Sequence, residues 1–131
     1  MEIYNVLIED ALVQKYVGNR IKFYEYPEPL EMTKPYIVMS ETDDTLPVEY
    51  ADNDNLALSY LVQIDVFVPE SEEYQAYFVR NKVSYHISRL MKEQLKMENT
   101  SNAKPEYDEE LKMYRSARRY EGIFYRSELN L

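Results

Sequence analysis

The chain has 131 residues, 45% of them hydrophobic, with a formal net charge of −9 and no cysteine. This length suits one domain with a single core over residues 1–131, and the lack of cysteine excludes disulfides, thiolate zinc sites and cysteine nucleophiles. Only two glycines occur, which excludes the glycine-rich phosphate loops of P-loop and Rossmann proteins.

The N-terminal part of the chain predicts one helix and one strand. Apolar residues recur at helical spacing over residues 2–17, and Gly18 is the expected stop, which together predict an amphipathic helix. Residues 20–26 alternate polar and apolar side chains, so they predict a strand that is closed by Pro27 and Pro29.

The middle of the chain predicts the spine of a sheet. Residues 56–68 are apolar at every second position, which is the period of a strand with one buried face. These positions are Leu56, Leu58, Tyr60, Val62, Ile64, Val66 and Val68. The opposite face is half polar, which favours a partner against it. We expect an antiparallel pairing with residues 35–42, across an acidic loop over residues 43–55.

A second, longer helix is predicted after the spine strand. Ser71 is the expected N-cap, with Glu72 and Glu73 in the first turn. Lys92 and Lys96 lie toward the other end, where the helix dipole favours positive charge. The apolar stripe of this helix comprises Val79, Val83, Ile87, Leu90 and Met91.

The C-terminal part predicts a polar link over residues 101–105 and a bent strand over residues 111–126. Apolar residues change from even to odd positions along that strand, which predicts a bulge at Gly122. The expected fold is therefore α+β, with a mostly antiparallel sheet, an N-terminal helix and a long second helix packed on it.

Charge is distributed unevenly along the chain. Residues 1–75 hold 16 acidic and 4 basic side chains, whereas residues 76–131 hold 8 and 11. An acidic body disfavours general affinity for nucleic acid and permits self-association through patches of opposite sign. Without a basic leader or a long apolar run in the sequence, we expect a soluble intracellular protein with no membrane contact.

The sequence offers few candidates for catalysis or metal binding. His86 is the only histidine, and packing is favoured over catalysis because the sequence places no nucleophile or orienting carboxylate beside it. Five acidic residues of the predicted loop could ligate a cation, but their spacing does not match an EF-hand and the loop has no glycine. We therefore expect no metal, no cofactor and no enzymatic activity.

Basic and aromatic residues alternate along the last predicted strand. The set comprises Lys112, Tyr114, Arg115, Arg118, Arg119, Tyr120 and Arg126. This pattern is typical of surfaces that stack bases and hold phosphate backbones. The net charge and the acidic neighbours oppose nucleic-acid binding, which leaves a solvated strand face and an ion-paired subunit contact as alternatives.

The order of these elements resembles a family of phage proteins. The segments that carry the resemblance are YLVQIDVFVPE, SEEYQAYFVRNKVSYHISRL and PEYDEELKMYRSARRYEGIFYR. The chain is similar in this order to the tail terminators, which are the tail-to-head joining or tail-completion proteins of long-tailed bacteriophages. The resemblance spans nearly the whole chain and consists of patterns, not of invariant catalytic residues.

The resemblance implies a structural virion protein at the tail–neck junction, assembled in the host cytoplasm. It implies a homohexameric ring that caps the tail tube, contacts the major tail tube protein and the head connector or stopper, and meets DNA only as the passing genome. Such a ring needs two unlike patches that meet between neighbours, so we expect acidic residues of one subunit to approach arginines of the next. The expected interface residues are Asp43, Asp44, Glu49, Asp52, Asp54, Arg115, Arg118 and Arg119.

Two other functions stay open. Another neck component, such as a head-closure or minor capsid protein, would differ in its neighbours rather than in its chemistry. A small nucleic-acid-binding module would use the strand around Arg115 and Arg119, and retention on heparin or DNA at low salt would distinguish it.

Overall fold

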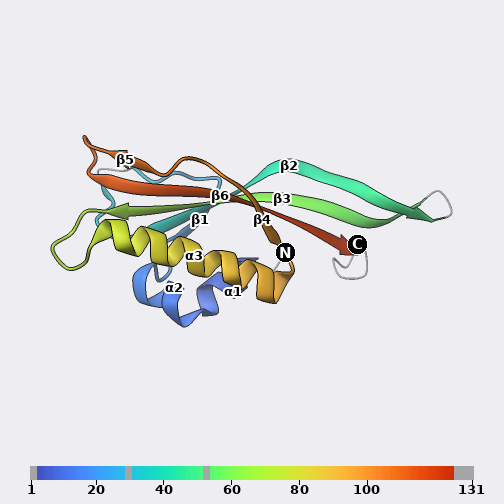
Figure 1. Cartoon of the computed structure of the whole chain (residues 1–131), viewed down its shortest axis with the longest axis horizontal. Helices are drawn as coiled ribbons and strands as arrows, with labels where there is room; N and C mark the ends of the chain where they lie inside the picture. Colours follow the sequence, from blue (N-terminus) through green and yellow to red (C-terminus); the bar gives the residue numbers. More distant parts are fainter. Residues whose placement is uncertain (1–2, 29–30, 52–53, 126–131) are drawn as a thin grey trace.

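The computed structural model describes residues 3–28, 31–51 and 54–125, with the backbone alone for 42–58 and 124–125. The elements in chain order are α1 (Ile3–Glu9), α2 (Ala11–Tyr16), β1 (Ile21–Phe23), β2 (Tyr36–Ala51), β3 (Asp54–Pro69), α3 (Ala76–Leu95), β4 (Glu98–Asn102), β5 (Glu106–Asp108) and β6 (Met113–Tyr125). Figure 1 shows the three helices on one side of a single sheet. The predicted α+β class is confirmed.

The sheet has six strands in the order β1-β2-β3-β6-β4, and β5 also pairs with β6. β1 runs parallel to β2, whereas the other pairings are antiparallel. β3 lies between the two other long strands, so the prediction of a sheet spine over residues 56–68 is confirmed. The predicted antiparallel pairing of this strand with residues 35–42 is also confirmed, because Tyr36 pairs with Phe67 and Met39 with Ile64.

The core lies between the sheet and the helices. On β3, the side chains of Val62, Ile64, Val66 and Val68 are at most 5% exposed, as their alternation predicts. The predicted stripe of α3 faces them and is buried along its whole length. Burial of each such aliphatic side chain contributes about 1.5–3 kcal/mol, so this contact holds α3 on the sheet. Within the described ranges, no helix combines the length and the apolar character that crossing a membrane requires.

The predicted single helix over residues 2–17 is wrong in one respect, because it is broken into α1 and α2 at Asp10. The backbone of Asp10 is extended, and its carboxylate accepts hydrogen bonds from the N–H groups of Leu12 and Val13, both at 3.0 Å. An N-cap of this kind starts a new helix. The predicted stop is confirmed, since Gly18 takes a left-handed conformation with φ of 61°.

The predicted start of the long helix is also wrong. Ser71 caps no helix, because its hydroxyl accepts a bond from the Glu73 N–H at 3.1 Å within the preceding turn. Tyr74 then packs on the core and donates to the Pro69 carbonyl at 2.8 Å, which ties down this turn, and α3 begins only at Ala76.

The acidic segment predicted as a loop over residues 43–55 is instead part of a long hairpin. β2 continues to Ala51 and β3 starts at Asp54, with register shifts that include one beside Pro47. Because β1 pairs only with residues 37–39 of β2, Pro47 lies on an edge stretch, where a missing N–H is tolerated. We call residues 42–51 and 54–61 the arm. Figure 1 shows the arm extending well past the helices.

The C-terminal strands differ from prediction in two ways. The polar link predicted over residues 101–105 begins within β4, since Ser101 and Asn102 pair with β6. The bulge predicted at Gly122 is absent from the β3–β6 ladder, which runs without a shift and pairs Gly122 with Tyr60. Apolar residues occupy both faces of β6 because Tyr120 packs in the main core, while Met113 joins a small second cluster on the other side.

Candidate functional site

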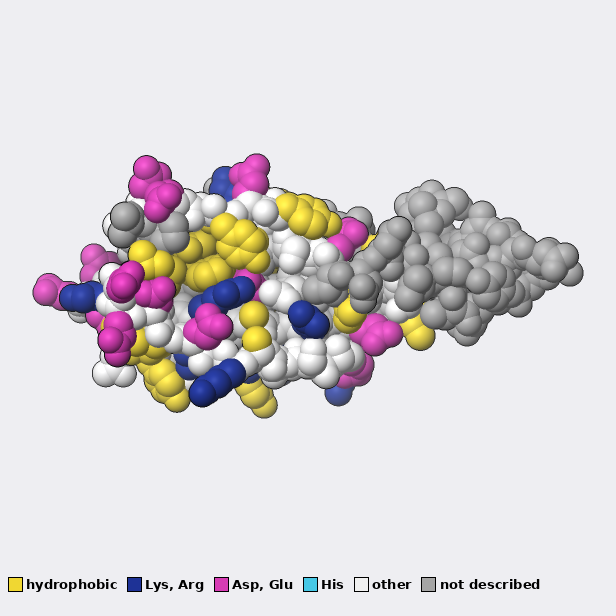
Figure 2. Space-filling view, turned by 90° about the horizontal axis from the view of Figure 1, so that it is seen from above, with side chains coloured by type: hydrophobic (Ala, Val, Ile, Leu, Met, Phe, Trp, Pro, Cys, Tyr) yellow, Lys and Arg dark blue, Asp and Glu magenta, His cyan; other side chains and the backbone are white. Residues whose placement is uncertain are grey.

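One side of the sheet carries no helix within the described residues, and we call it the helix-free face. The side chains that β3 and β6 place on it include Gln63, Asp65, Phe67, Arg115, Ala117 and Arg119. The segment that follows β1 crosses part of this face, where the rings of Tyr26 and Phe67 meet edge to face at 6.1 Å. Figure 2 looks onto it and shows hydrophobic side chains beside basic and acidic ones. The mixture makes this face the candidate site.

A buried carboxylate organises the helix-free face. Asp65 is 1% exposed, and its Oδ2 accepts from Arg115 Nη2 at 2.7 Å and from the Tyr26 hydroxyl at 3.2 Å. Its Oδ1 accepts from Gln63 Nε2 at 2.8 Å. A buried charge is tolerated when it is paired and fully hydrogen-bonded, and Asp65 meets both conditions.

Arg115 is held by this carboxylate and by aromatic rings. Its guanidinium lies 5.3 Å from the centre of the Phe67 ring, which itself stacks on Tyr36 at 4.8 Å. Burial alone would lower the pKa of Arg115, but the hydrogen bond and charge of Asp65 and the charge of Glu106 raise it above its usual value. Arg115 is therefore a fixed cation, while its Nε is buried without a hydrogen-bond partner among the described residues.

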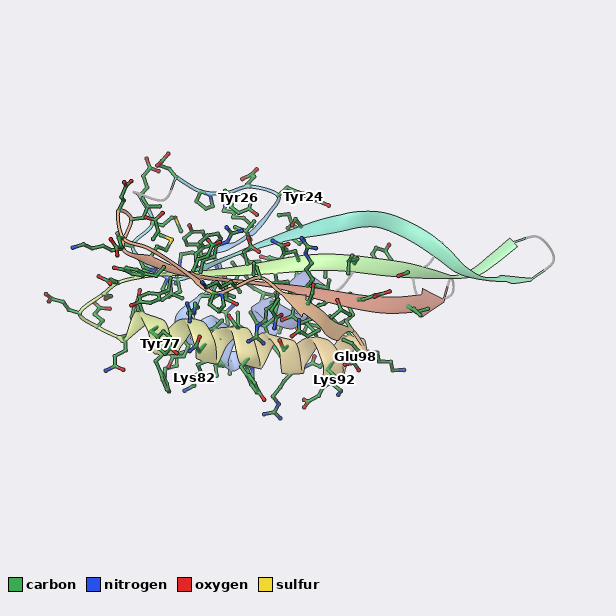
Figure 3. All side chains as sticks on the ribbon, turned by 45° about the horizontal axis from the view of Figure 1, so that its top comes forward. Tyr24, Tyr26, Tyr77, Lys82, Lys92 and Glu98 are labelled. Atoms are coloured by element: carbon green, nitrogen blue, oxygen red, sulfur yellow. The ribbon has the colours of Figure 1, made fainter. Side chains whose placement is uncertain are left out.

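Burial, followed by the charge of Asp65, raises the pKa of Tyr26 above its usual value. The Tyr26 hydroxyl therefore stays protonated and donates to Asp65. Figure 3 shows Tyr26 on the side of the sheet away from α3.

A groove of about 370 Å³ lies beside this cluster, between the β3–β6 surface and the chain from β4 to β5. Basic side chains from both sides line it, namely Lys104, Arg115 and Arg119. Arg119 Nε donates to Gln63 Oε1 at 3.1 Å, which joins Arg119 to the Asp65 network through one side chain. These converging donors make the groove suitable for binding a carboxylate or another oxyanion.

The structure separates the three arginines of the predicted interface. Arg115 and Arg119 lie on the helix-free face, whereas Arg118 Nη1 donates to the Ser88 hydroxyl of α3 at 2.9 Å. Successive side chains of a strand point to opposite faces, so Arg118 and Arg119 cannot belong to one flat patch. The three arginines of the predicted interface therefore do not form one surface.

The acidic residues of the predicted interface belong to the arm. Asp43, Asp44 and Glu49 lie on β2, and Asp54 begins β3. The structure describes only the backbone at these four positions, and Asp52 lies outside the described residues. The four acidic residues that the structure describes thus lie on the two strands of a hairpin and not in a loop.

His86 takes part in a structural contact between helices. Its Nε2 lies 2.9 Å from Asp10 Oδ2, which connects the start of α2 to the middle of α3. Burial would raise the pKa of Asp10, but the hydrogen bonds from His86 and from the backbone outweigh it and lower the pKa below the ordinary value. The packing interpretation of His86 agrees with this arrangement.

Sequence reasoning missed the residues that organise the candidate site. The alternation places Asp65 only on a half-polar strand face, although a lone acidic residue between Ile64 and Val66 is a signal of a buried ion pair. Lys104 gave no signal, because it lies in an exposed segment without periodicity. The Asp65–Arg115 pair joins residues 50 positions apart, a distance over which the pattern of a single sequence carries no information.

A comparison with models of protein families gave no match, and a comparison with curated proteins gave none either.

Proposed function

We propose that this protein is a structural subunit that closes into a ring at the end of a phage tail, as a tail terminator that joins the tail to the head connector. The proposal combines the resemblance in the order of elements with one structural observation, which is the arm. It assigns no catalysis to the chain. The proposed partners are further copies of the chain, the tail tube protein and the connector or stopper.

The arm is the observation that carries the proposal. The buried core residues described on β2 reach to Met39, and on β3 the first described residue packed on the core is Tyr60, yet both strands continue beyond these positions. β6 accompanies β3 only as far as the pairing of Ala57 with Tyr125. At about 3.3 Å per residue the arm is roughly 30 Å long, and its outermost residues extend past the end of β6.

The outer end of the arm is a hairpin of two strands, because the pairing of β6 with β3 stops at Ala57. Two strands alone are marginally stable in water. The arm nevertheless contains Leu46, Val48, Leu56 and Leu58 in its sequence. In the proposed ring, a neighbouring subunit packs against this segment.

Contact between the arm of one copy and a different surface of the next is heterologous. Contacts of this type generate a closed ring when a whole number of the rotations that relate neighbouring copies makes one full turn. The uneven charge along the chain suits such a contact, since the acidic half contains the arm and the basic half contains β6. In the proposal, such a ring surrounds the passing genome.

The proposal is tested in a long-tailed phage that encodes this protein, by removing its gene and imaging the particles by negative stain. We expect tails of uncontrolled length that carry no heads, because nothing stops the growth of the tube. Supplying the full chain should restore defined tails, and supplying a chain whose residues 42–61 are replaced by an Asn-Gly turn should not. Normal, head-bearing particles without the gene would contradict the proposal.

A matched variant separates the arm from the rest of the surface. Lys82→Glu changes an exposed residue on the outer side of α3, and Figure 3 shows Lys82 directed away from the sheet. This variant should restore tails as well as the full chain does. Failure of both variants would show that general charge or stability, and not the arm, decides the outcome.

A further inference from the structure

The groove on the helix-free face carries uncompensated positive charge. Lys104, Arg115 and Arg119 line it, and Glu106 is the acidic residue among its described lining. Asp65 neutralises Arg115 at 2.7 Å, and Glu106 approaches the same guanidinium at 3.6 Å. Among the described residues, Lys104 and Arg119 form no ion pair, so the groove presents two exposed cations on a protein whose net charge is −9.

Arg119 is oriented before any ligand arrives. Its Nε donates to Gln63 at 3.1 Å, and its backbone carbonyl accepts from Asn99 Nδ2 at 2.9 Å. Within the part of the chain that the structure describes, its terminal Nη atoms have no partner, which leaves a planar pair of donors for one carboxylate. A donor that is already held loses less freedom on binding.

The arm has the charge that complements this groove. Residues 42–61 contain five acidic side chains and no lysine or arginine. Figure 1 shows the arm leading away from the body of its own chain, so its outer end is directed toward a different molecule rather than toward its own groove. Attraction between an acidic arm and a basic groove speeds the encounter of two subunits. It also fixes the position in which the two subunits bind.

We propose that the groove formed by Gln63, Lys104, Arg115 and Arg119 receives the acidic β2–β3 arm of a second copy of this chain. This inference rests on the proposed ring and names the surface through which the ring closes. Arg119 binds a carboxylate through its free Nη atoms, and Lys104 adds a second positive charge at the rim. Arg118 belongs to the contact with α3 and takes no part.

Charge reversal tests the pairing in the purified full-length chain. Lys104→Glu with Arg119→Glu should weaken self-association about 100-fold, measured by sedimentation velocity at low salt, because like charges then face each other. Lys82→Glu with Lys92→Glu makes the same change of charge on the α3 side and should leave association unchanged; Figure 3 places both lysines there. Thermal unfolding checks that each variant is folded.

Reversing the charges of the arm as well tests whether the first variant fails because the arm and groove no longer pair, or because it is less stable. Asp43→Lys with Asp44→Lys should also prevent association, and a chain that carries all four substitutions should associate again. Failure of the fourfold variant to associate, with each double variant folded, would overturn the proposal.

The absence of natural cysteine allows a direct measurement of proximity. Oxidation of a chain with Arg119→Cys and Asp44→Cys should give a ladder of linked subunits, whereas Lys82→Cys with Asp44→Cys should give monomers. Rings of the unmodified chain together with no specific ladder would contradict the groove and leave the proposed function intact. A chain that forms no ring, even on tail tubes, would contradict the proposed function itself.

Nucleic acid is the competing ligand for two exposed cations. Loss of heparin retention in the Lys104→Glu and Arg119→Glu variant, with ring formation unchanged, would assign the groove to phosphate and overturn the proposal. Equal retention of this variant and the unmodified chain supports the pairing of subunits.

Discussion

Asp65 holds together the hydrogen-bond network of the helix-free face. Its two oxygens accept from side chains on three separate segments, namely Tyr26 after β1, Gln63 on β3 and Arg115 on β6. A carboxylate in this position fixes the arginine more firmly than a surface ion pair would, because the bond is shielded from water. Asp65 therefore links three segments of the chain beside the groove, and we expect it to contribute to the stability of the domain.

Replacement of that carboxylate by an amide should be costly. In Asp65→Asn the Arg115 charge loses its closest partner, and we expect a loss of about 2–3 kcal/mol of unfolding free energy in urea titrations. Glu106→Gln is the matched control, since Glu106 is 63% exposed and should change stability by less than about 0.5 kcal/mol. Equal effects of the two substitutions would contradict the central place of Asp65.

The Asp10–His86 contact should appear in the acid dependence of stability. The folded-state pKa of Asp10 lies below the unfolded value, so its contribution is present above about pH 4 and is lost as the pH falls through the folded pKa. The difference in unfolding free energy between the natural chain and Asp10→Asn should therefore shrink between pH 5 and pH 2.5. Asp10→Ser, which keeps an N-cap oxygen, should behave like Asp10→Asn, and a constant difference would contradict this assignment.

The secondary-structure elements are defined as much by their ends as by their apolar faces. α2 begins at a side-chain cap, whereas the N-cap of α3, Gln75, makes no side-chain cap bond. At the other end of α3, Lys96 adopts the left-handed conformation, with φ of 55° and ψ of 34°, and its N–H donates to the Met91 carbonyl. A residue with a Cβ is strained in this conformation, whereas glycine is not.

Glycine at that position should stabilise the domain. We expect Lys96→Gly to raise the unfolding free energy by about 0.5–1 kcal/mol, because relief of the strain exceeds the added freedom of the unfolded chain. Lys92→Gly, inside the last turn, should lower it by about 1 kcal/mol. Thermal unfolding of the two variants decides the matter, and a loss of stability in Lys96→Gly would contradict the left-handed cap.

The elements that the sequence predicts well are those with periodic burial. The spine strand and the stripe of α3 follow from periods of two and 3.6, because each buries one face. The sequence does not predict β4 and β5, because every residue in these strands is exposed and their apolar residues therefore show no periodic pattern. The break at Asp10 depends partly on His86, which lies 76 positions away, and the candidate groove likewise joins distant segments.

The whole molecule combines a packed body with a hairpin that extends beyond it. Helices cover one side of the body, while the other side carries the Asp65 network and the basic groove. The arm and the basic groove are the two features on which the proposed assembly rests. A contact between the arm of one copy and the groove of the next would pair their opposite charges and would join single chains into a closed assembly.

An electron cryomicroscopy map of the head–tail junction tests this account most directly. We expect six copies of the chain in a closed ring at the end of the tail tube, with each arm lying across the Lys104 and Arg119 side of its neighbour. A junction without this chain, or one that holds it as separate copies that do not touch, would contradict the account.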